Sequence, residues 1–170
     1  MRSLLVFLTI GLLGFAPAHA ADDAIPTFGD WAKQCEEAPP AEGGEASGEI
    51  CYVFQTVSNR ETGQMLMQVR VGFAPNRAEP VMIVTLPLGA LLPPGAAFLM
   101  DGIEPVKMAF LACGREGCTT VGQPLSAAVI EAMQKGEQAV VRVAMLNKQV
   151  VPLPVSLKGF TRAYNAIAPK

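Results

Sequence analysis

Residues Val106–Gly122, VKMAFLACGREGCTTVG, carry the strongest fold signal in this chain of 170 residues. An apolar run leads into Cys113, the four residues 114–117 turn the chain, and Cys118 leads into a second strand-like run. Apolar runs on either side of a glycine-bounded turn are typical of a β-hairpin. We therefore predict a hairpin with a disulfide between Cys113 and Cys118 across its base, and further strands packed around it.

The first 20 residues have the pattern of a secretory signal peptide. A basic residue is followed by the apolar run Leu4–Phe15, and the segment ends in the small-residue sequence AHA at residues 18–20. A membrane anchor is the alternative, but it needs roughly 20 consecutive apolar residues. We expect cleavage after Ala20, export of the chain, and a single domain over residues 21–170.

Composition and charge exclude several classes of function. Without residues 1–20 the chain has 12 basic and 15 acidic side chains, a formal charge of −3, and no basic patch that would favour nucleic acid. No later segment is long and apolar enough to span a membrane. His19, the only histidine, would leave with the signal peptide, which removes Ser-His-Asp catalysis and histidine-containing zinc or copper sites.

Four cysteines remain in the mature chain: Cys35, Cys51, Cys113 and Cys118. An even number in an exported chain predicts disulfide bonds. We favour Cys35–Cys51 and Cys113–Cys118 among the three possible pairings, because each pair is close in sequence and flanks a turn-rich segment. A redox or metal site is the alternative, but the chain has no C-x-x-C motif. We therefore expect two structural disulfides, no metal and no cofactor.

Short runs rich in β-branched, aromatic or alternating apolar residues recur along the chain and predict strands. They are Thr27–Gln34, Ile50–Val57, Gln64–Phe73, Val81–Leu86, Ala96–Met100, Val106–Ala112, Thr119–Val121, Gln138–Leu146 and Gln149–Leu157. Pro152 and Pro154 place the last strand at a sheet edge or in a bulge. Many short strands with Pro- and Gly-rich turns predict a mostly β fold, an antiparallel β-sandwich.

Two segments predict short helices beside the strands. Pro124–Lys135 has apolar residues on one face and is followed by Gly136, a common helix terminator. Gly159–Ile167 has apolar residues at helical spacing and should form a closing helix that packs on the sandwich. Trp31, the only tryptophan, is expected in the core rather than in a ligand site.

The segment Pro87–Gly95, PLGALLPPG, is apolar yet contains too many chain breakers for a helix or a strand. Such a loop is either buried as a crossover between sheets or exposed toward a partner. Exposed apolar patches are uncommon on soluble monomers, which favours burial. If the loop is exposed instead, Leu88, Leu91 and Leu92 are the candidate contact residues.

Several motifs in one order resemble a known family. They are FGDW at residues 28–31, Cys35 and Cys51, LPLGALLPPG at 86–95, F-x-x-C at 110–113 with Cys118, and VSLKGF at 155–160. This order is similar to the invasion-associated locus B family of exported bacterial proteins, over nearly the whole mature chain. The resemblance implies a Gram-negative periplasmic or outer-membrane-associated β-sandwich protein with no established enzymatic activity, and it supplies no catalytic residues.

Three functions remain open at this stage. The first, which we favour, is a non-enzymatic envelope protein that binds another protein or an envelope component, with a link to host-cell interaction that the family's name suggests. The second is a structural or chaperone-like subunit of an outer-membrane complex. The third is a hydrolase that uses Asp101 and Glu104, an acidic pair beside a predicted strand end. No serine-hydrolase motif is present, and Ser156 is explained by the end of a strand.

Overall fold

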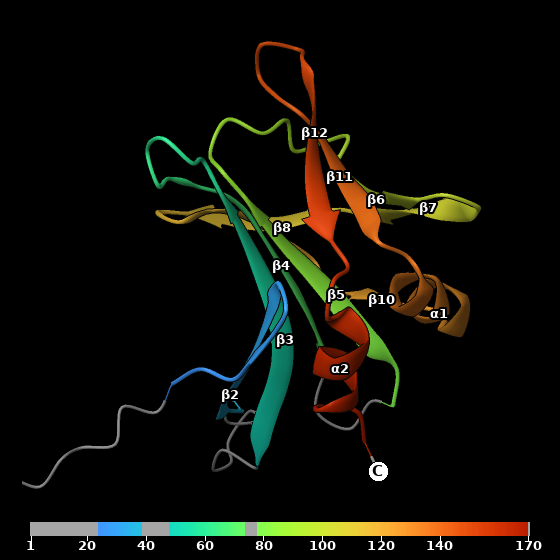
Figure 1. The fold of residues 1–170 in the computed structure, drawn as a ribbon. Coiled ribbons are helices and arrows are strands. Elements are labelled where there is room, and N and C mark those ends of the chain that lie inside the picture. The colour runs from blue at the N-terminus through green and yellow to red at the C-terminus, as the bar shows by residue number, and fades with distance from the viewer. Residues whose placement is uncertain (1–23, 39–47, 74–77, 170) are drawn as a thin grey trace, which may run out of the picture.

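The computed structural model describes residues 24–38, 48–73 and 78–169, which form two antiparallel β-sheets and two short helices (Figure 1). The predicted signal peptide, residues 1–20, lies outside the described residues. No helix in the described ranges is long and apolar enough to cross a membrane.

The larger sheet has eight strands in the order β1-β2-β3-β4-β5-β9-β8, with β10 also paired to β5. These strands are β1 (Thr27–Phe28), β2 (Trp31–Glu37), β3 (Glu49–Ser58), β4 (Met65–Phe73), β5 (Pro80–Leu86), β8 (Phe110–Gly114), β9 (Gly117–Thr120) and β10 (Gln123–Pro124). The prediction of one strand over Thr27–Gln34 is wrong. Gly29 and Asp30 form a turn that pairs Phe28 with Trp31, so the segment is a hairpin.

The smaller sheet has four strands in the order β12-β11-β6-β7. These strands are β6 (Ala96–Met100), β7 (Ile103–Met108), β11 (Gln138–Ala144) and β12 (Val150–Ser156). The proline-containing strand β12 lies at the edge, as predicted, because a proline nitrogen has no hydrogen to donate to a neighbouring strand.

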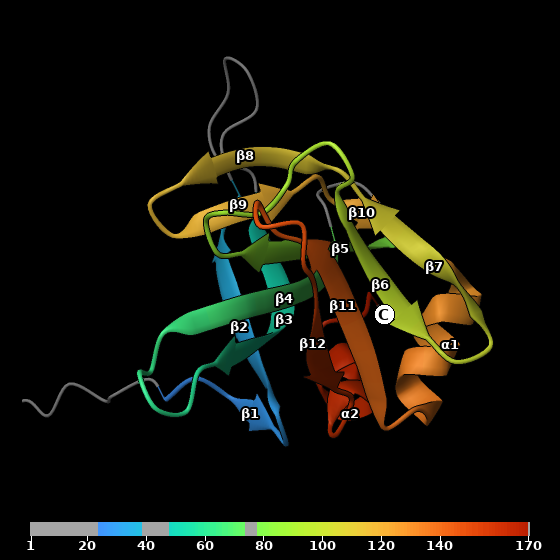
Figure 2. The same ribbon diagram turned by 90° about the horizontal axis from the view of Figure 1, so that it is seen from above.

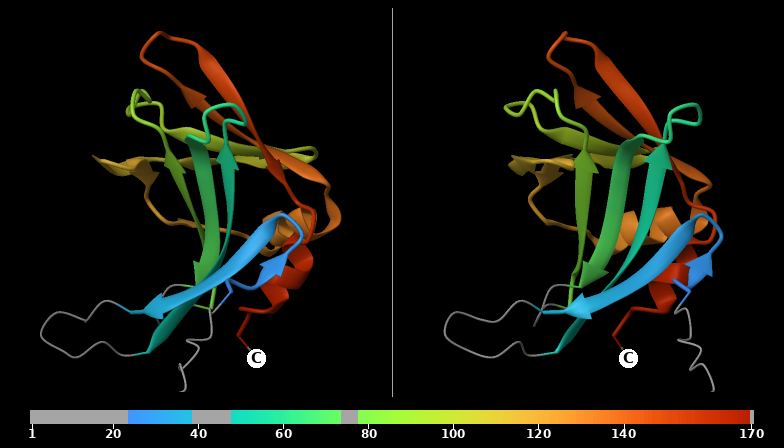
Figure 3. Two further views of the ribbon diagram at one scale, coloured as in Figure 1. Left: turned by 60° about the vertical axis from the view of Figure 1, so that its left-hand side comes forward. Right: turned by 90° about the vertical axis from the view of Figure 1, so that its left-hand side faces the viewer.

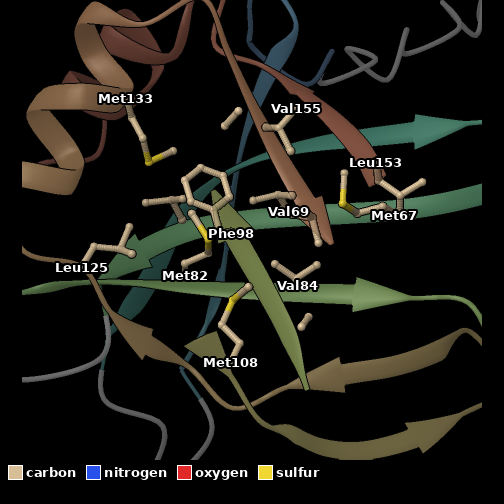
Figure 4. Close-up of a cluster of buried hydrophobic side chains, with 14 of the residues drawn as sticks. Met67, Val69, Met82, Val84, Phe98, Met108, Leu125, Met133, Leu153 and Val155 are labelled. Carbon is tan, nitrogen blue, oxygen red and sulfur yellow. The ribbon is translucent and has the colours of Figure 1, made fainter. Parts of the chain in front are cut away.

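The core lies between the two sheets (Figure 4). Val69 and Val84 of the larger sheet face Phe98 and Val155 of the smaller sheet across it. Alternate residues of β4 are buried, which confirms the period-two pattern in this segment. The methionine side chains in this region, among them Met67, are buried in the core, as expected for apolar filler.

The stretch Val106–Gly122 connects the two sheets. β7 ends at Met108 in the smaller sheet, and the hairpin β8–β9 then forms one edge of the larger sheet (Figure 2). The predicted single strand over Val106–Ala112 is therefore wrong, because the chain changes sheets at Ala109. The hairpin itself is confirmed. Its turn is shorter than the predicted four residues, because Gly114 and Gly117 pair with each other and only the two residues between them turn the chain.

Both predicted helices are present. α1 (Ala127–Lys135) begins after Ser126, whose Oγ accepts a hydrogen bond from the Val129 N–H at 3.4 Å. It starts later than predicted because Pro124 pairs with Val81 in the sheet. α2 (Phe160–Asn165) packs Phe160 against Trp31, with ring centroids 5.0 Å apart.

Each disulfide joins two directly opposed residues of an antiparallel strand pair, Cys35 with Cys51 and Cys113 with Cys118. The pairs are 16 and 5 residues apart in sequence.

The two disulfides should contribute unequally to stability, because in the chain-entropy model the disulfide that closes the longer loop stabilises the fold more. Replacing both cysteines of a pair by serine should lower the free energy of unfolding by about 3 kcal/mol for Cys35–Cys51 and by about 2 kcal/mol for Cys113–Cys118. Urea denaturation of the two double variants measures this difference, and the reverse order would contradict the loop-length argument.

Candidate functional site

The loop Pro87–Gly95 lies at one end of the sandwich, beside the tip of the β11–β12 hairpin (Figure 1). Leu88 is 59% exposed and Leu92 is 47% exposed, whereas Leu91 is only partly exposed. The interpretation as a fully buried crossover is therefore wrong for Leu88 and Leu92. Their role as contact residues stays a prediction.

Backbone hydrogen bonds hold this loop to the β11–β12 hairpin. The Leu91 N–H donates to the Ala144 carbonyl at 2.8 Å, and the Leu146 N–H donates to the Gly89 carbonyl at 2.8 Å. Ala90 and Met145 form a β-bridge between them. The loop and the hairpin tip are therefore one preformed surface rather than two independent segments.

The hairpin adds two exposed aliphatic side chains to this surface. Leu146 is 68% exposed and Val150 is 62% exposed. We call the surface formed by Leu88, Leu91, Leu92, Leu146 and Val150 the apolar end. Leu146 and Val150 were not among the predicted contact residues, although Leu146 stands directly beside the turn residues Asn147 and Lys148.

The apolar end is free of carboxylates. Neither Leu86–Met100, which contains the loop, nor Gln138–Leu157, which contains the hairpin, has an Asp or Glu. The hairpin segment does have Arg142 and Lys148. In a chain with a formal net charge of −2, these two segments together are therefore positive, while the β3–β4 turn at the same end of the molecule carries Arg60 and Glu61 (Figure 1).

A polar cavity of about 640 Å³ opens where the two sheets meet, lined in part by Asp30, Gln55, Glu137 and Ser156. Gln55 is 6% exposed; its Nε2 donates to the Ser156 carbonyl at 3.0 Å, and its Oε1 accepts from the Ser156 N–H at 2.9 Å. The Ser156 Oγ donates to Asp30 Oδ2 at 2.6 Å.

This network has a structural explanation. Ser156 lies in the edge strand β12, which has a neighbouring strand on one side only. The Gln55 side chain forms hydrogen bonds with both the N–H and the carbonyl of Ser156, as a neighbouring strand would. Trp31 adds a third link, because its Nε1 donates to the same Ser156 carbonyl at 2.9 Å. The residues therefore join the two sheets, and the hydrogen bond from the Ser156 hydroxyl to Asp30 belongs to the same link.

The two members of the acidic pair in the hydrolase hypothesis do not line the same described groove. Asp101 lies in the turn after β6, whereas Glu104 on β7 lines a groove of about 550 Å³ together with Lys107 and Ser126. Among the residues described as lining this groove, Glu104 is the only carboxylate. A glycosidase needs two carboxyl groups on either side of the scissile bond, so this groove does not support the hypothesis.

The clustered cysteines do not offer a metal site. The ligand atoms of Cys35, Glu49 and Cys51 lie within 4.8 Å of one another. Both sulfurs are joined in the disulfide, however, and a thiolate is the form of cysteine that binds metal.

Three described groups have shifted pKa values, all outside the apolar end. Burial, and then the charge of Glu36, raises the pKa of Tyr52; burial alone raises the pKa of Tyr164. The hydrogen bond from Lys135 lowers the pKa of Glu131. Each of these shifts stabilises the charge state that the group ordinarily has at neutral pH.

The family model described as Invasion associated locus B (IalB) protein matches residues 31–168. The chain belongs to this family. The matched residues include both disulfides, the apolar end and the lining of the polar cavity except Asp30. It confirms the resemblance inferred from the order of the motifs.

A solved structure shows the same fold. Invasion associated protein B from Bartonella henselae is similar, with a TM-score of 0.69 and 18% sequence identity over 84% of this chain and 93% of that chain. At this identity the likeness concerns the fold, and it confirms the predicted β-sandwich. No curated protein sequence matches the chain.

Proposed function

We propose that this member of the invasion-associated locus B family is an exported, non-enzymatic protein that binds another protein or a component of the cell envelope through its apolar end. The observation that carries the proposal is the group of four exposed aliphatic side chains at that end: Leu88, Leu92, Leu146 and Val150. Exposed aliphatic side chains grouped on neighbouring segments of a folded domain are a common feature of interaction sites.

Other features support this role. The family is not a known enzyme family. The two disulfides fit an oxidising compartment, and with the signal-peptide pattern at residues 1–20 they favour a periplasmic or outer-membrane-associated location. The preformed backbone of the apolar end limits the entropy lost when a partner binds.

Replacing both Leu88 and Leu92 by serine should lower the yield of crosslinked partner at least about tenfold, because exposed aliphatic anchors often dominate binding. Neither side chain is buried, so the melting temperature should change by less than about 2 °C. The measurement is crosslinking and capture of the processed, disulfide-intact protein from living cells. Leu91 is left unchanged because it is partly buried and its substitution would also disturb packing.

The matched control is Ile25→Ser, which removes an aliphatic side chain of similar exposure. Ile25 precedes β1, the strand at one edge of the larger sheet, whereas β8 forms the other edge. Equal capture by the double variant and the control would contradict the proposal. A complex that survives purification would favour the alternative role as a structural or chaperone-like subunit of an outer-membrane complex, whereas a transient contact would favour a binding module.

A further inference from the structure

We infer that the occupant of the apolar end is the surface of an anionic lipid bilayer, with Leu88, Leu92, Leu146 and Val150 entering the boundary between headgroups and acyl chains. This inference rests on the proposed function, because it names the partner of the same site. Three observations carry it: the projecting shape of the end, its charge, and its preformed backbone.

The apolar end projects from the sandwich. The tip of the β11–β12 hairpin extends beyond the sheets, with the β5–β6 loop beside it at the same end (Figure 3). The exposed side chains belong to this loop and to this hairpin. A bilayer boundary deforms around such projections and can cover all four side chains at once.

The charge of the apolar end complements anionic headgroups. Lys148 lies in the turn of the projecting hairpin. Arg142 of β11 is exposed and pairs with Pro152 of β12. Two residues further along β11, on the same face, Ala144 pairs with Val150. Arg142 and Val150 therefore share one face of the hairpin. Leucine and valine beside lysine and arginine form the combination that binds the interface of an anionic membrane.

The net charge of the chain and the fixed backbone of the apolar end both favour docking through this end. The formal net charge of the chain is −2, so it has no general attraction to an anionic surface. An approach that points Leu86–Met100 and Gln138–Leu157 at the lipid brings no carboxylate of these segments into the contact, since neither segment has any. The hydrogen bonds between Leu91 and Ala144 and between Leu146 and Gly89 keep the loop and the hairpin in one arrangement, so docking requires little ordering.

Cosedimentation with vesicles tests the inference. The processed, disulfide-intact protein should sediment with vesicles of equal parts phosphatidylglycerol and phosphatidylethanolamine, and much less with phosphatidylcholine vesicles. Replacing Leu146 and Val150 by serine should lower the partition coefficient at least about tenfold, since each buried aliphatic side chain contributes strongly. Lys148→Glu should lower it about fivefold or more at low salt, and this loss should shrink as salt screens the charge.

The control is again Ile25→Ser, which should sediment like the unchanged protein. Two results would overturn the inference: no sedimentation with the anionic vesicles, or sedimentation that the Leu146/Val150 double variant leaves unchanged. If vesicle binding fails but crosslinked capture in cells still depends on Leu88 and Leu92, the partner is a protein and the proposed function stands. If both measurements fail, both proposals are wrong.

Discussion

Replacing Trp31 by alanine is expected to lower the free energy of unfolding by about 3–5 kcal/mol, the range for removing a large aromatic side chain from a core. Trp31 is fully buried, and its ring meets the edge of Phe160 at a centroid distance of 5.0 Å. Its Nε1 donates to the Ser156 carbonyl at 2.9 Å. One side chain thus connects the larger sheet, helix α2 and the edge strand of the smaller sheet.

Trp31→Phe separates the two contributions, because phenylalanine retains most of the apolar contact and removes the hydrogen bond to Ser156. We expect a loss of about 1–3 kcal/mol for this variant, from the smaller ring and from one lost hydrogen bond to the Ser156 carbonyl, which keeps its bond from Gln55. Urea denaturation followed by circular dichroism is the suitable measurement, since Trp31 is the only tryptophan. A loss below about 1 kcal/mol for Trp31→Ala would show that the site collapses around the missing ring.

Gly159→Ala should destabilise the fold by at least about 3 kcal/mol, from backbone strain and steric overlap together. Gly159 precedes helix α2 with φ +89°, in the left-handed region that favours glycine. A Cβ atom there would lie 1.8 Å from the Phe28 carbonyl oxygen. The backbone at Gly159 and the backbone at Phe28 would have to move apart. The backbone N–H of Asp30 would then lose its hydrogen bond to the Lys158 carbonyl.

Gly63→Ala is the matched control for this prediction. Gly63 also has a positive φ, +69°, but no heavy atom lies within 4 Å of the position of its Cβ. Only the conformational cost of about 1–2 kcal/mol should then remain. Thermal unfolding of the two variants measures the difference, and equal melting temperatures would show that close approach at Gly159 adds nothing to the cost of its backbone conformation.

The strands could be predicted where local pattern and pairing agree. Alternation in β4 marked its buried face, and the prolines of β12 marked an edge. The hairpin at Phe28–Trp31 was missed because β1 has two residues, too few to show alternation. The change of sheet at Ala109 was missed because it depends on which strands β7 and β8 pair with, and those partners are distant in sequence.

The candidate site was predictable in part. Chain breakers in an apolar run pointed to Leu88 and Leu92, because such a run cannot be a regular strand. Leu146 and Val150 lie within the predicted strands Gln138–Leu146 and Gln149–Leu157, where nothing in the local pattern distinguished them from other strand residues. The role of Gln55 had no local signal either, because its partner Ser156 is 101 residues away in the chain.

The covalent bond between Cys35 and Cys51 ties together the two ends of the segment that connects β2 and β3. A protease that cuts this segment once, at any peptide bond between the two cysteines, therefore releases nothing. The fragment that ends with β2 stays attached to the fragment that begins with β3, and the six pairs of residues between these strands can persist. A single cut between the two cysteines would therefore leave the β1–β2 hairpin covalently joined to the rest of the molecule.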